Sequence, residues 1–265
     1  ARKEQMVEEL KAERAKYHDR PEWSYSQMKV ILDSGIDYAV AAKRKLLPAP
    51  ESKAIDIGTL VHQAILGGDE QFVISPYDNF RTKAAQEWRD QQLEMQRIVI
   101  KKEDSDIINQ IAANIKNHPL YNKYLGKDKK AFHELELTAK ADGVALRGKA
   151  DYLRILPSGG LIITDIKTTA KFDEFFRKAQ WSHYDLQAAV YSLIGTQATN
   201  SKQELTNYYF CVAETVAPFR VQFMHASLEF VEAGERKLRK CLDEIKEFGD
   251  REPNFLIEEV RELGD

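Results

Sequence analysis

The stretch GKADYLRILPSGGLIITDIKTT, residues 148–169, decides the fold of this protein. It holds two runs rich in apolar and β-branched residues, separated by the turn signal Ser158-Gly159-Gly160, and this pattern predicts a β-hairpin. A third run of the same kind begins near Phe132 and ends at the turn dipeptide Asp142-Gly143. Together the three runs predict a β-meander.

Helices are predicted on both sides of the meander from apolar spacing, capping residues and breakers. Before it come an exposed charged helix over 1–20, a capped helix from Ser24, a helix over 55–66 and a mostly helical stretch over 81–118, interrupted near 98–102. After it come a helix through Gln187, strands over 204–214 and 219–225, and a last helix over 227–248. No repeat or low-complexity linker divides the chain, so we expect a single α/β domain.

Composition excludes several classes of protein. The 265 residues carry 39 Lys and Arg against 42 Asp and Glu, a formal net charge of −3, which argues against a protein that coats nucleic acid but leaves room for a local basic groove. No apolar run approaches the roughly 18 residues of a membrane span, so no membrane partner is expected.

Cys211 and Cys241 are too few for a disulfide framework, which favours free thiols in the cytoplasm. The charged start at Ala1 lacks a secretory signal and an initiator Met, which suggests a fragment of a longer chain.

Two carboxylates and a lysine are the candidate chemistry. In LIITDIK, Asp165 and Lys167 share one strand face at the strand end, with Ile166 turned to the core. Asp151 lies on the preceding strand, and a hairpin would bring both carboxylates to a common point. Such hard oxygen ligands suit Mg²⁺, and an adjacent ammonium can orient a water or offset phosphate charge. An Asp-x-Lys triplet alone carries little weight, so the flanking elements decide.

Those elements resemble a known family. GKADYL and GLIITDIKTT, followed by the helical motif Gln187-x-x-x-Tyr191 and preceded by Gly58-x-x-x-His62, look like the PD-(D/E)xK nuclease superfamily, in its Gln-x-x-x-Tyr branch. Within it the chain is most similar to the C-terminal nuclease domain of the RecE-type recombination nucleases (exodeoxyribonuclease VIII), over roughly residues 24–225. The prolyl-aspartate pair is not literal, because Ala150 precedes Asp151.

The resemblance implies a restriction-endonuclease-like core, with a central mixed β-sheet flanked by helices and a helical N-terminal part. It implies one nuclease domain over 1–265, made of an N-terminal helical extension (1–22), a nuclease core (23–225) and a C-terminal helix and tail (226–265). The roles it implies are metal binding by His62, Glu134, Asp151, Asp165 and the Ile166 carbonyl, catalysis by Lys167 with both aspartates, and lining of the site by Gln187 and Tyr191. Glu136 stays an alternative to Glu134. The purely structural alternatives are that His62 is a histidine packed in the core and that the Gln-x-x-x-Tyr residues are an ordinary polar and aromatic pair on an amphipathic helix.

The implied activity is a Mg²⁺-dependent deoxyribonuclease, with Mn²⁺ as a possible substitute. The resemblance implies a 5′→3′ exonuclease that degrades linear double-stranded DNA from its ends and leaves 3′ single strands for recombination by single-strand annealing. It also implies a ring-shaped homo-oligomer and a single-strand annealing recombinase as partner. A structure-selective or single-strand-specific endonuclease of the superfamily and a catalytically silent DNA-binding module remain alternatives. Among several basic clusters, Arg81 and Lys83 are the first choice for contacting DNA ends.

Overall fold

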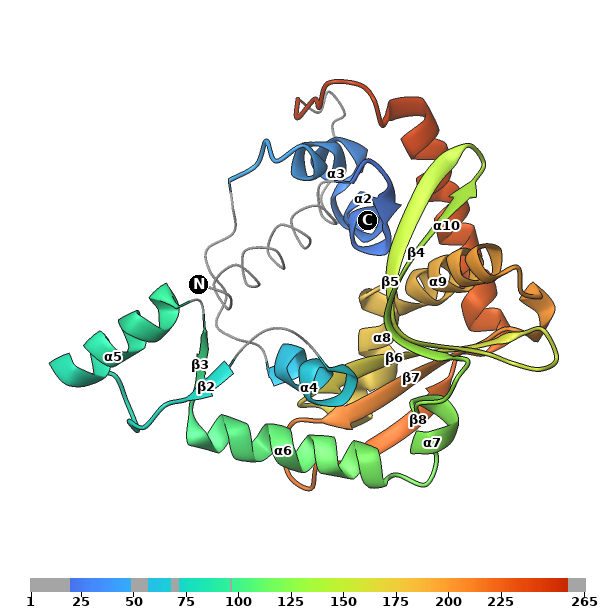
Figure 1. Ribbon diagram of the computed structural model, residues 1–265. Coiled ribbons are helices and arrows are strands. Elements are labelled where there is room, and N and C mark those ends of the chain that lie inside the picture. The colour runs from blue at the N-terminus through green and yellow to red at the C-terminus, as the bar shows by residue number, and fades with distance from the viewer. Residues whose placement is uncertain (1–19, 49–56, 68–71, 96, 257–265) are drawn as a thin grey trace.

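The computed structural model describes residues 20–48, 57–67, 72–95 and 97–256 (Figure 1). Its main sheet has six strands in the order β1-β5-β6-β7-β8, with β4 paired to β5. The strands are β1 (Trp23–Ser24), β4 (Ala131–Ala141), β5 (Val144–Ile155), β6 (Leu161–Thr169), β7 (Asn207–Glu214) and β8 (Val221–His225). The predicted helix over 1–20 lies outside the described residues except for Arg20, as does the end of the predicted tail, and the predicted domain division stays a prediction.

The predicted meander is confirmed as β4, β5 and β6. Its first turn places Asp142 and Gly143 at φ 48° and 88°, the left-handed values that a two-residue hairpin turn of this type requires. In the second turn a Cβ on Gly160 would lie 2.0 Å from the carbonyl oxygen of Leu205, so only glycine fits there. β6 then pairs in parallel with β7, which makes the sheet mixed.

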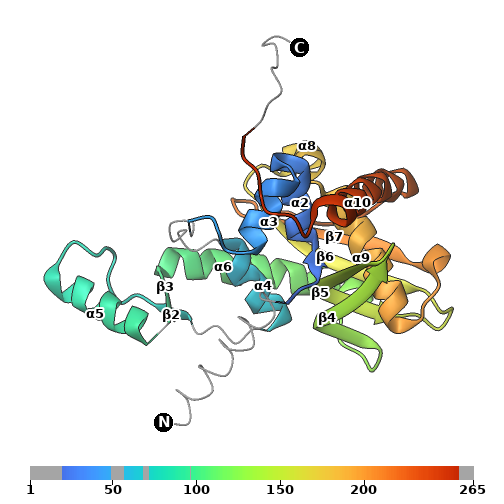
Figure 2. The same cartoon turned by 90° about the horizontal axis from the view of Figure 1, so that it is seen from above.

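Helices cover both faces of this sheet, and the predicted α/β class with a central mixed sheet is confirmed (Figures 1 and 2). The first face packs against α2 (Tyr25–Ser34), α3 (Ile36–Lys43), α8 (Phe175–Trp181), α9 (Tyr184–Thr199) and α10 (Leu228–Phe248). The second packs against α4 (Ile57–Leu66), α6 (Lys102–Asn117) and α7 (Tyr121–Tyr124). None of the helices in the described ranges combines the length and apolar character needed to cross a lipid bilayer.

Several elements were not predicted from the sequence, among them the helices α3 and α7 and the strands β1 and β2. β1 is only two residues long and pairs in parallel with β5, opposite Leu146 and Arg147. The break expected near residues 98–102 is a strand, β3 (Ile98–Ile100), which pairs in parallel with β2 (Phe72–Ile74) and precedes α6, while α5 (Lys83–Glu94) lies between them in the chain. Three consecutive β-branched residues explain why this segment is extended.

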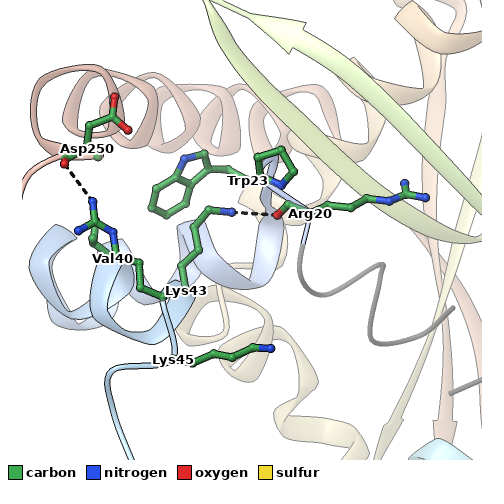
Figure 3. A pocket seen from close by; sticks show the side chains of 9 residues that line it. Arg20, Trp23, Val40, Lys43, Lys45 and Asp250 are labelled. Carbon is green, nitrogen blue, oxygen red and sulfur yellow. Dashed lines mark hydrogen bonds between the residues drawn. The ribbon is translucent and has the colours of Figure 1, made fainter. Parts of the chain in front are cut away.

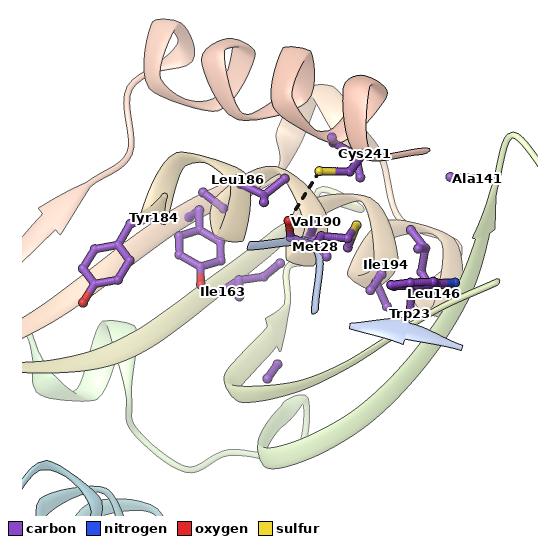
Figure 4. Packing of buried hydrophobic residues seen from close by; sticks show 14 of the residues in the cluster. Trp23, Met28, Ala141, Leu146, Ile163, Tyr184, Leu186, Val190, Ile194 and Cys241 are labelled. Atoms are coloured by element: carbon purple, nitrogen blue, oxygen red, sulfur yellow. Dashed lines mark hydrogen bonds between the residues drawn. The ribbon is translucent and has the colours of Figure 1, made fainter. Parts of the chain in front are cut away.

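The alternation of β6 divides the two cores. Leu161 and Ile163 point to the α9 side, whereas Ile162 and Ile166 point to the α4 and α6 side. Figure 4 shows the first core, in which side chains of α9 lie between the sheet and α10. There the thiol of Cys241 lies 3.6 Å from the carbonyl oxygen of Met28, which joins α10 to α2. Both cysteines are buried and free, as predicted.

The closest helix packing occurs where α10 crosses the start of α9. A Cβ on Gly234 would lie 1.9 Å from the carbonyl oxygen of Asp185 and 2.9 Å from the amide nitrogen of Leu186. Both of these are backbone atoms that cannot rotate away. Lys237, one turn further along α10, donates to the Asp185 carboxylate at 2.8 Å. Gly234 therefore sets the separation of the two helices.

We predict that Gly234→Ala lowers the free energy of unfolding by about 3 kcal/mol, because the added methyl forces two backbones apart. Urea unfolding followed by circular dichroism measures this change. Glu232→Ala is the matched control, since it alters an exposed position on the same helix and should change stability by under about 0.5 kcal/mol. Equal stability of the Gly234 variant and the wild type would contradict this account of the packing.

Candidate active site

The candidate site lies where two neighbouring strands separate. β5 and β6 pair from Ile155 with Leu161 to Tyr152 with Thr164, and the next positions in this register are Asp151 and Asp165. Backbone pairing stops there, and the Ile166 amide instead donates to Asp151 Oδ2 at 2.8 Å. Beyond this fork β5 continues beside β1 and β4, while β6 continues beside β7. The two carboxylates therefore meet at the fork, as the hairpin predicted.

The strand alternation also changes phase at Asp151. Ala150 belongs to the core under α9 and Tyr152 to the opposite core, although a regular strand would place residues two apart on one face. Across the ladder, Glu134 sits between the paired positions on either side of Asp151 and has φ 53°. A left-handed backbone conformation is uncommon for a glutamate inside a strand, and it changes the direction of the chain locally. This irregularity lies beside the carboxylate that the sequence singled out.

Asp165 and Lys167 lie on one face of β6, as predicted, with Ile166 fully buried on the other. Lys167 Nζ lies 2.8 Å from Asp165 Oδ2, and Gln187 Nε2 on α9 donates to Asp165 Oδ1 at 2.5 Å. The lysine ammonium also lies 4.6 Å from the centre of the Tyr184 ring, a cation–π contact. One turn of α9 thus positions both members of the Asp-x-Lys pair.

His62 reaches the same place from α4 on the opposite face of the sheet. Its Nε2 lies 2.7 Å from the carbonyl oxygen of Ile166, so Nε2 must be the donor, because a carbonyl only accepts. Its Nδ1 lies 3.4 Å from Asp151 Oδ2. Both backbone groups of Ile166 are therefore fixed by side chains of the site, the amide by Asp151 and the carbonyl by His62.

Burial and mutual repulsion dominate the electrostatics. Burial, helped by the charge of Asp165, raises the pKa of Asp151 to about 7, against smaller lowering effects from His62, the Ile166 amide and Lys167. Burial alone would lower the pKa of Lys167, but the Asp165 carboxylate, with Tyr184 and Asp151, raises it above its ordinary value. The Lys167 side chain is therefore positively charged at neutral pH. It lies beside two carboxyl groups, and the charge of Asp165 makes ionisation of Asp151 less favourable.

The donor set fits a hard divalent cation. Asp165 Oδ2, which lies 2.8 Å from the Lys167 ammonium, and Gln187 Oε1, which accepts no hydrogen bond from a described residue, are buried oxygens of the site. With Asp151 and the Ile166 carbonyl they form an oxygen-only set of the kind that Mg²⁺ and Mn²⁺ bind. No group of three or more His, Cys, Asp or Glu side chains is arranged to hold a metal within the part of the chain that the structure describes. Such an ion would therefore keep several water or phosphate ligands.

The other predicted residues lie further out. The Tyr191 ring packs on β5, where a Cβ on Gly148 would lie 3.1 Å from its Cε1. Glu134 forms an ion pair with Lys149, and Glu136 forms one with Arg20 at 3.2 Å. The metal-binding roles predicted for His62 and Glu134 stay predictions, as does the choice between the two glutamates.

Arg81 and Lys83 lie well apart from the fork. They stand at the start of α5, which projects away from the main sheet in both views (Figures 1 and 2). Lys83 is exposed and pairs with Glu87 at 3.7 Å, and the Arg81 amide donates to the Asn79 side chain at 3.1 Å. Their predicted contact with DNA ends stays a prediction.

Two aromatic residues of the site were missed by sequence reasoning. Tyr184, under Lys167, stands three residues before Gln187 at the start of the same helix, and this spacing was the available signal. Tyr25 donates from its hydroxyl to the carbonyl oxygen of Ser182 at 2.8 Å, which ties α2 to the segment before α9. No sequence motif marks this contact.

A basic cavity of about 440 Å³ also lies between β1, α3 and the segment after α10 (Figure 3). Its cations are engaged in internal contacts. Lys43 donates to the carbonyl oxygens of Arg20 and Glu22 at 3.3 and 2.9 Å, and Arg44 donates to that of Asp250 at 2.9 Å. These bonds hold three segments together, so we interpret this cavity as structural.

The raised pKa of Asp151 predicts a pH-dependent stability. A carboxyl whose pKa rises from 3.8 in the unfolded chain to about 7 in the folded one contributes stability that is fully present below 3.8 and lost as pH rises through 7. Asp151→Asn removes this loss, so in EDTA the variant should exceed the wild type by about 2 kcal/mol at pH 8 and by less at pH 5. Urea unfolding at both pH values measures the difference, with exposed Asp106→Asn as control. A difference independent of pH would contradict the interpretation.

Comparisons with known proteins bear on the fold and the family of the chain. The chain is similar to a candidate exonuclease from Eubacterium rectale of known crystal structure, at a TM-score of 0.53 and 16% identity over 91% of each chain. It is less similar to the solved structure of SSO0001, with a TM-score of 0.29 and 11% identity over 80% of this chain and 86% of that one. No curated protein matches.

Residues 24–254 match a family described as a PDDEXK-like domain of unknown function (DUF3799). The chain belongs to this PDDEXK-like family, which confirms the PD-(D/E)xK assignment made from the sequence.

Proposed function

We propose that this protein is a divalent-metal-dependent deoxyribonuclease that hydrolyses phosphodiester bonds, with Mg²⁺ as its metal and Mn²⁺ as a substitute. The observation that carries the proposal is the pair Asp151 and Asp165 at the fork of two strands, with side chains 13% and 10% exposed and the Lys167 ammonium 2.8 Å from the second carboxylate. Membership of the PDDEXK-like family supports the same reaction class.

The chemistry follows from the positions of the side chains. When bound, the metal would lower the pKa of a coordinated water and stabilise the leaving 3′-oxygen. Asp151, Asp165 and the Ile166 carbonyl would hold it, and Gln187 fixes Asp165 while His62 fixes the carbonyl.

Lys167 lies on the same face of the strand as Asp165 and would face a scissile phosphate bound there. Because its pKa is raised, it would stay protonated, offset the charge that develops on the phosphoryl oxygens and orient the attacking water. As the water oxygen loses a proton to solvent and bonds to phosphorus, the bond from phosphorus to the 3′-oxygen breaks and the 3′-oxygen takes up a proton from solvent.

The finer proposal is a 5′→3′ exonuclease that degrades linear double-stranded DNA and leaves 3′ single strands for recombination by single-strand annealing. Its support is the resemblance to RecE-type nucleases. The same resemblance supports a ring-shaped homo-oligomer, in which the exposed residues Arg81 and Lys83 contact DNA ends, and a single-strand annealing recombinase as partner. The two free, buried cysteines support a cytoplasmic setting.

Two other functions make different predictions. A structure-selective or single-strand-specific endonuclease would cut substrates that have no free duplex end. A silent DNA-binding module would bind DNA and leave it intact. The contacts that orient Asp165 and Lys167 favour catalysis, because a binding module has no need of two buried, repelling carboxylates.

Lys167→Ala should reduce DNA cleavage at least about 100-fold, because it removes the cation beside Asp165. The assay uses linear duplex labelled at the 5′ or the 3′ end, and covalently closed circles, with Mg²⁺ or with EDTA. Wild type should release the 5′ label as mononucleotides, spare circles and stop in EDTA. Lys240→Ala, an exposed lysine on α10, is the matched control and should cleave like wild type.

The same assay separates the alternatives. Cleavage of closed circles would replace the exonuclease by an endonuclease. A wild-type protein that leaves every substrate intact in both Mg²⁺ and Mn²⁺ would remove the catalytic proposal.

A further inference from the structure

A second cavity, of about 440 Å³, lies directly beyond the end of β6. Thr169 lines it and lies two residues after Lys167, so Asp165, Lys167 and Thr169 follow one another along a single strand face. With a rise of about 3.3 Å per residue, Thr169 is about 7 Å from Lys167 along the strand. The cavity therefore continues the surface on which the candidate catalytic pair lies.

An exposed tryptophan forms one wall of this cavity. Trp181, the last residue of α8, is 76% exposed, whereas Trp23 is 7% exposed. A bare indole of this size at a cavity mouth offers a flat apolar surface to a ligand. Trp181 is followed by Ser182, which accepts the hydrogen bond from Tyr25, and by the turn into α9. The Tyr184 ring, three residues after Trp181, contacts the Lys167 ammonium, so the indole lies on a segment next to the candidate catalytic pair.

Cations surround the same indole. Arg177 and Lys178 precede Trp181 by four and three residues and share its helix face, and Lys171 lines the cavity from the preceding turn. The single carboxylate among the lining residues, Glu174, pairs with Lys171 at 3.4 Å. Lys178 donates to the carbonyl oxygen of Thr168 at 3.2 Å, while Arg177 has no hydrogen bond or ion pair to any described residue. The cavity therefore carries a net positive charge.

We propose that this cavity binds single-stranded DNA, with a nucleobase stacked on Trp181 and backbone phosphates contacted by Arg177 and Lys178. An aromatic platform flanked by cations is the arrangement with which proteins bind single strands without reading sequence. The inference rests on the proposed nuclease function for its occupant, and it adds a strand-holding site next to the scissile phosphate. Inside a duplex both faces of each base are stacked and only the terminal pair exposes one face, so single strands are the preferred ligand.

The test is binding of a fluorescent dT₁₂ oligonucleotide in EDTA, where no cleavage takes place, measured by anisotropy on the full chain. Trp181→Ala should weaken binding about 5- to 100-fold, and Trp181→Phe should restore most of it. Phe176→Ala is the matched control, because Phe176 is 75% exposed on the same helix but does not line the cavity, and its Kd should stay within twofold of wild type. Arg177→Ala should reduce the slope of log Kd against log salt concentration by the amount expected for about one phosphate contact.

Three results would overturn the proposal. The first is an unchanged DNA affinity of the Trp181→Ala variant, and the second is an equal loss of DNA affinity in the Phe176→Ala variant. The third is a Trp181→Ala variant whose molecular mass by light scattering differs from that of wild type while its DNA affinity is intact, which would make the surface a protein interface. Cleavage assays separate this inference from the nuclease itself. Wild type that cleaves DNA while Trp181→Ala binds normally refutes only the cavity. Binding of dT₁₂ that depends on Trp181, without cleavage in any metal, refutes only the nuclease.

Discussion

The hydrogen bond from the Ile166 amide to Asp151 is the constraint on which the rest of the site depends. In a regular sheet that amide would face a backbone carbonyl, and the two strands would continue side by side. Here the Asp151 carboxylate accepts the hydrogen bond in place of a backbone carbonyl, so β5 and β6 separate. Beyond this point β5 continues beside β1 and β4, and β6 continues beside β7. Because the bond leaves the second oxygen of Asp151 available, the same side chain can end the ladder and serve a ligand.

Bringing two carboxylates together in a buried place is costly, and the fold offsets the cost with donors from three directions. Lys167 comes from the strand itself, Gln187 from the helix on one face and the Ile166 amide from the backbone. His62 completes the arrangement from the opposite layer. The result is a site supported by both cores, so its geometry depends on the whole sandwich of helices and sheet.

Sequence patterns were sufficient for the meander, most of the longer helices and the face shared by Asp165 and Lys167, because these follow from local periodicity and turn chemistry. They could not reveal β1, whose two residues carry no period, or the left-handed Glu134, whose conformation is imposed by the neighbouring strand. The contact between Tyr25 and Ser182 was missed for a similar reason, because it joins segments that are far apart in the sequence. Tyr184 was missed although its position three residues before Gln187 on one helix was an available signal.

The contact at Gly234 extends the functional unit beyond its motifs. Gln187 lies in the first turn of α9, two residues after Asp185, and α10 rests against the backbone of Asp185. The C-terminal helix therefore limits how far α9 can move away from the sheet (Figure 4). A chain shortened after His225 would keep every residue of the PD-(D/E)xK pattern yet lose the helix that holds α9, and with it Gln187, against the sheet. The part of the fold that positions Gln187 thus includes α10, which begins only after the last strand of the sheet has ended at His225.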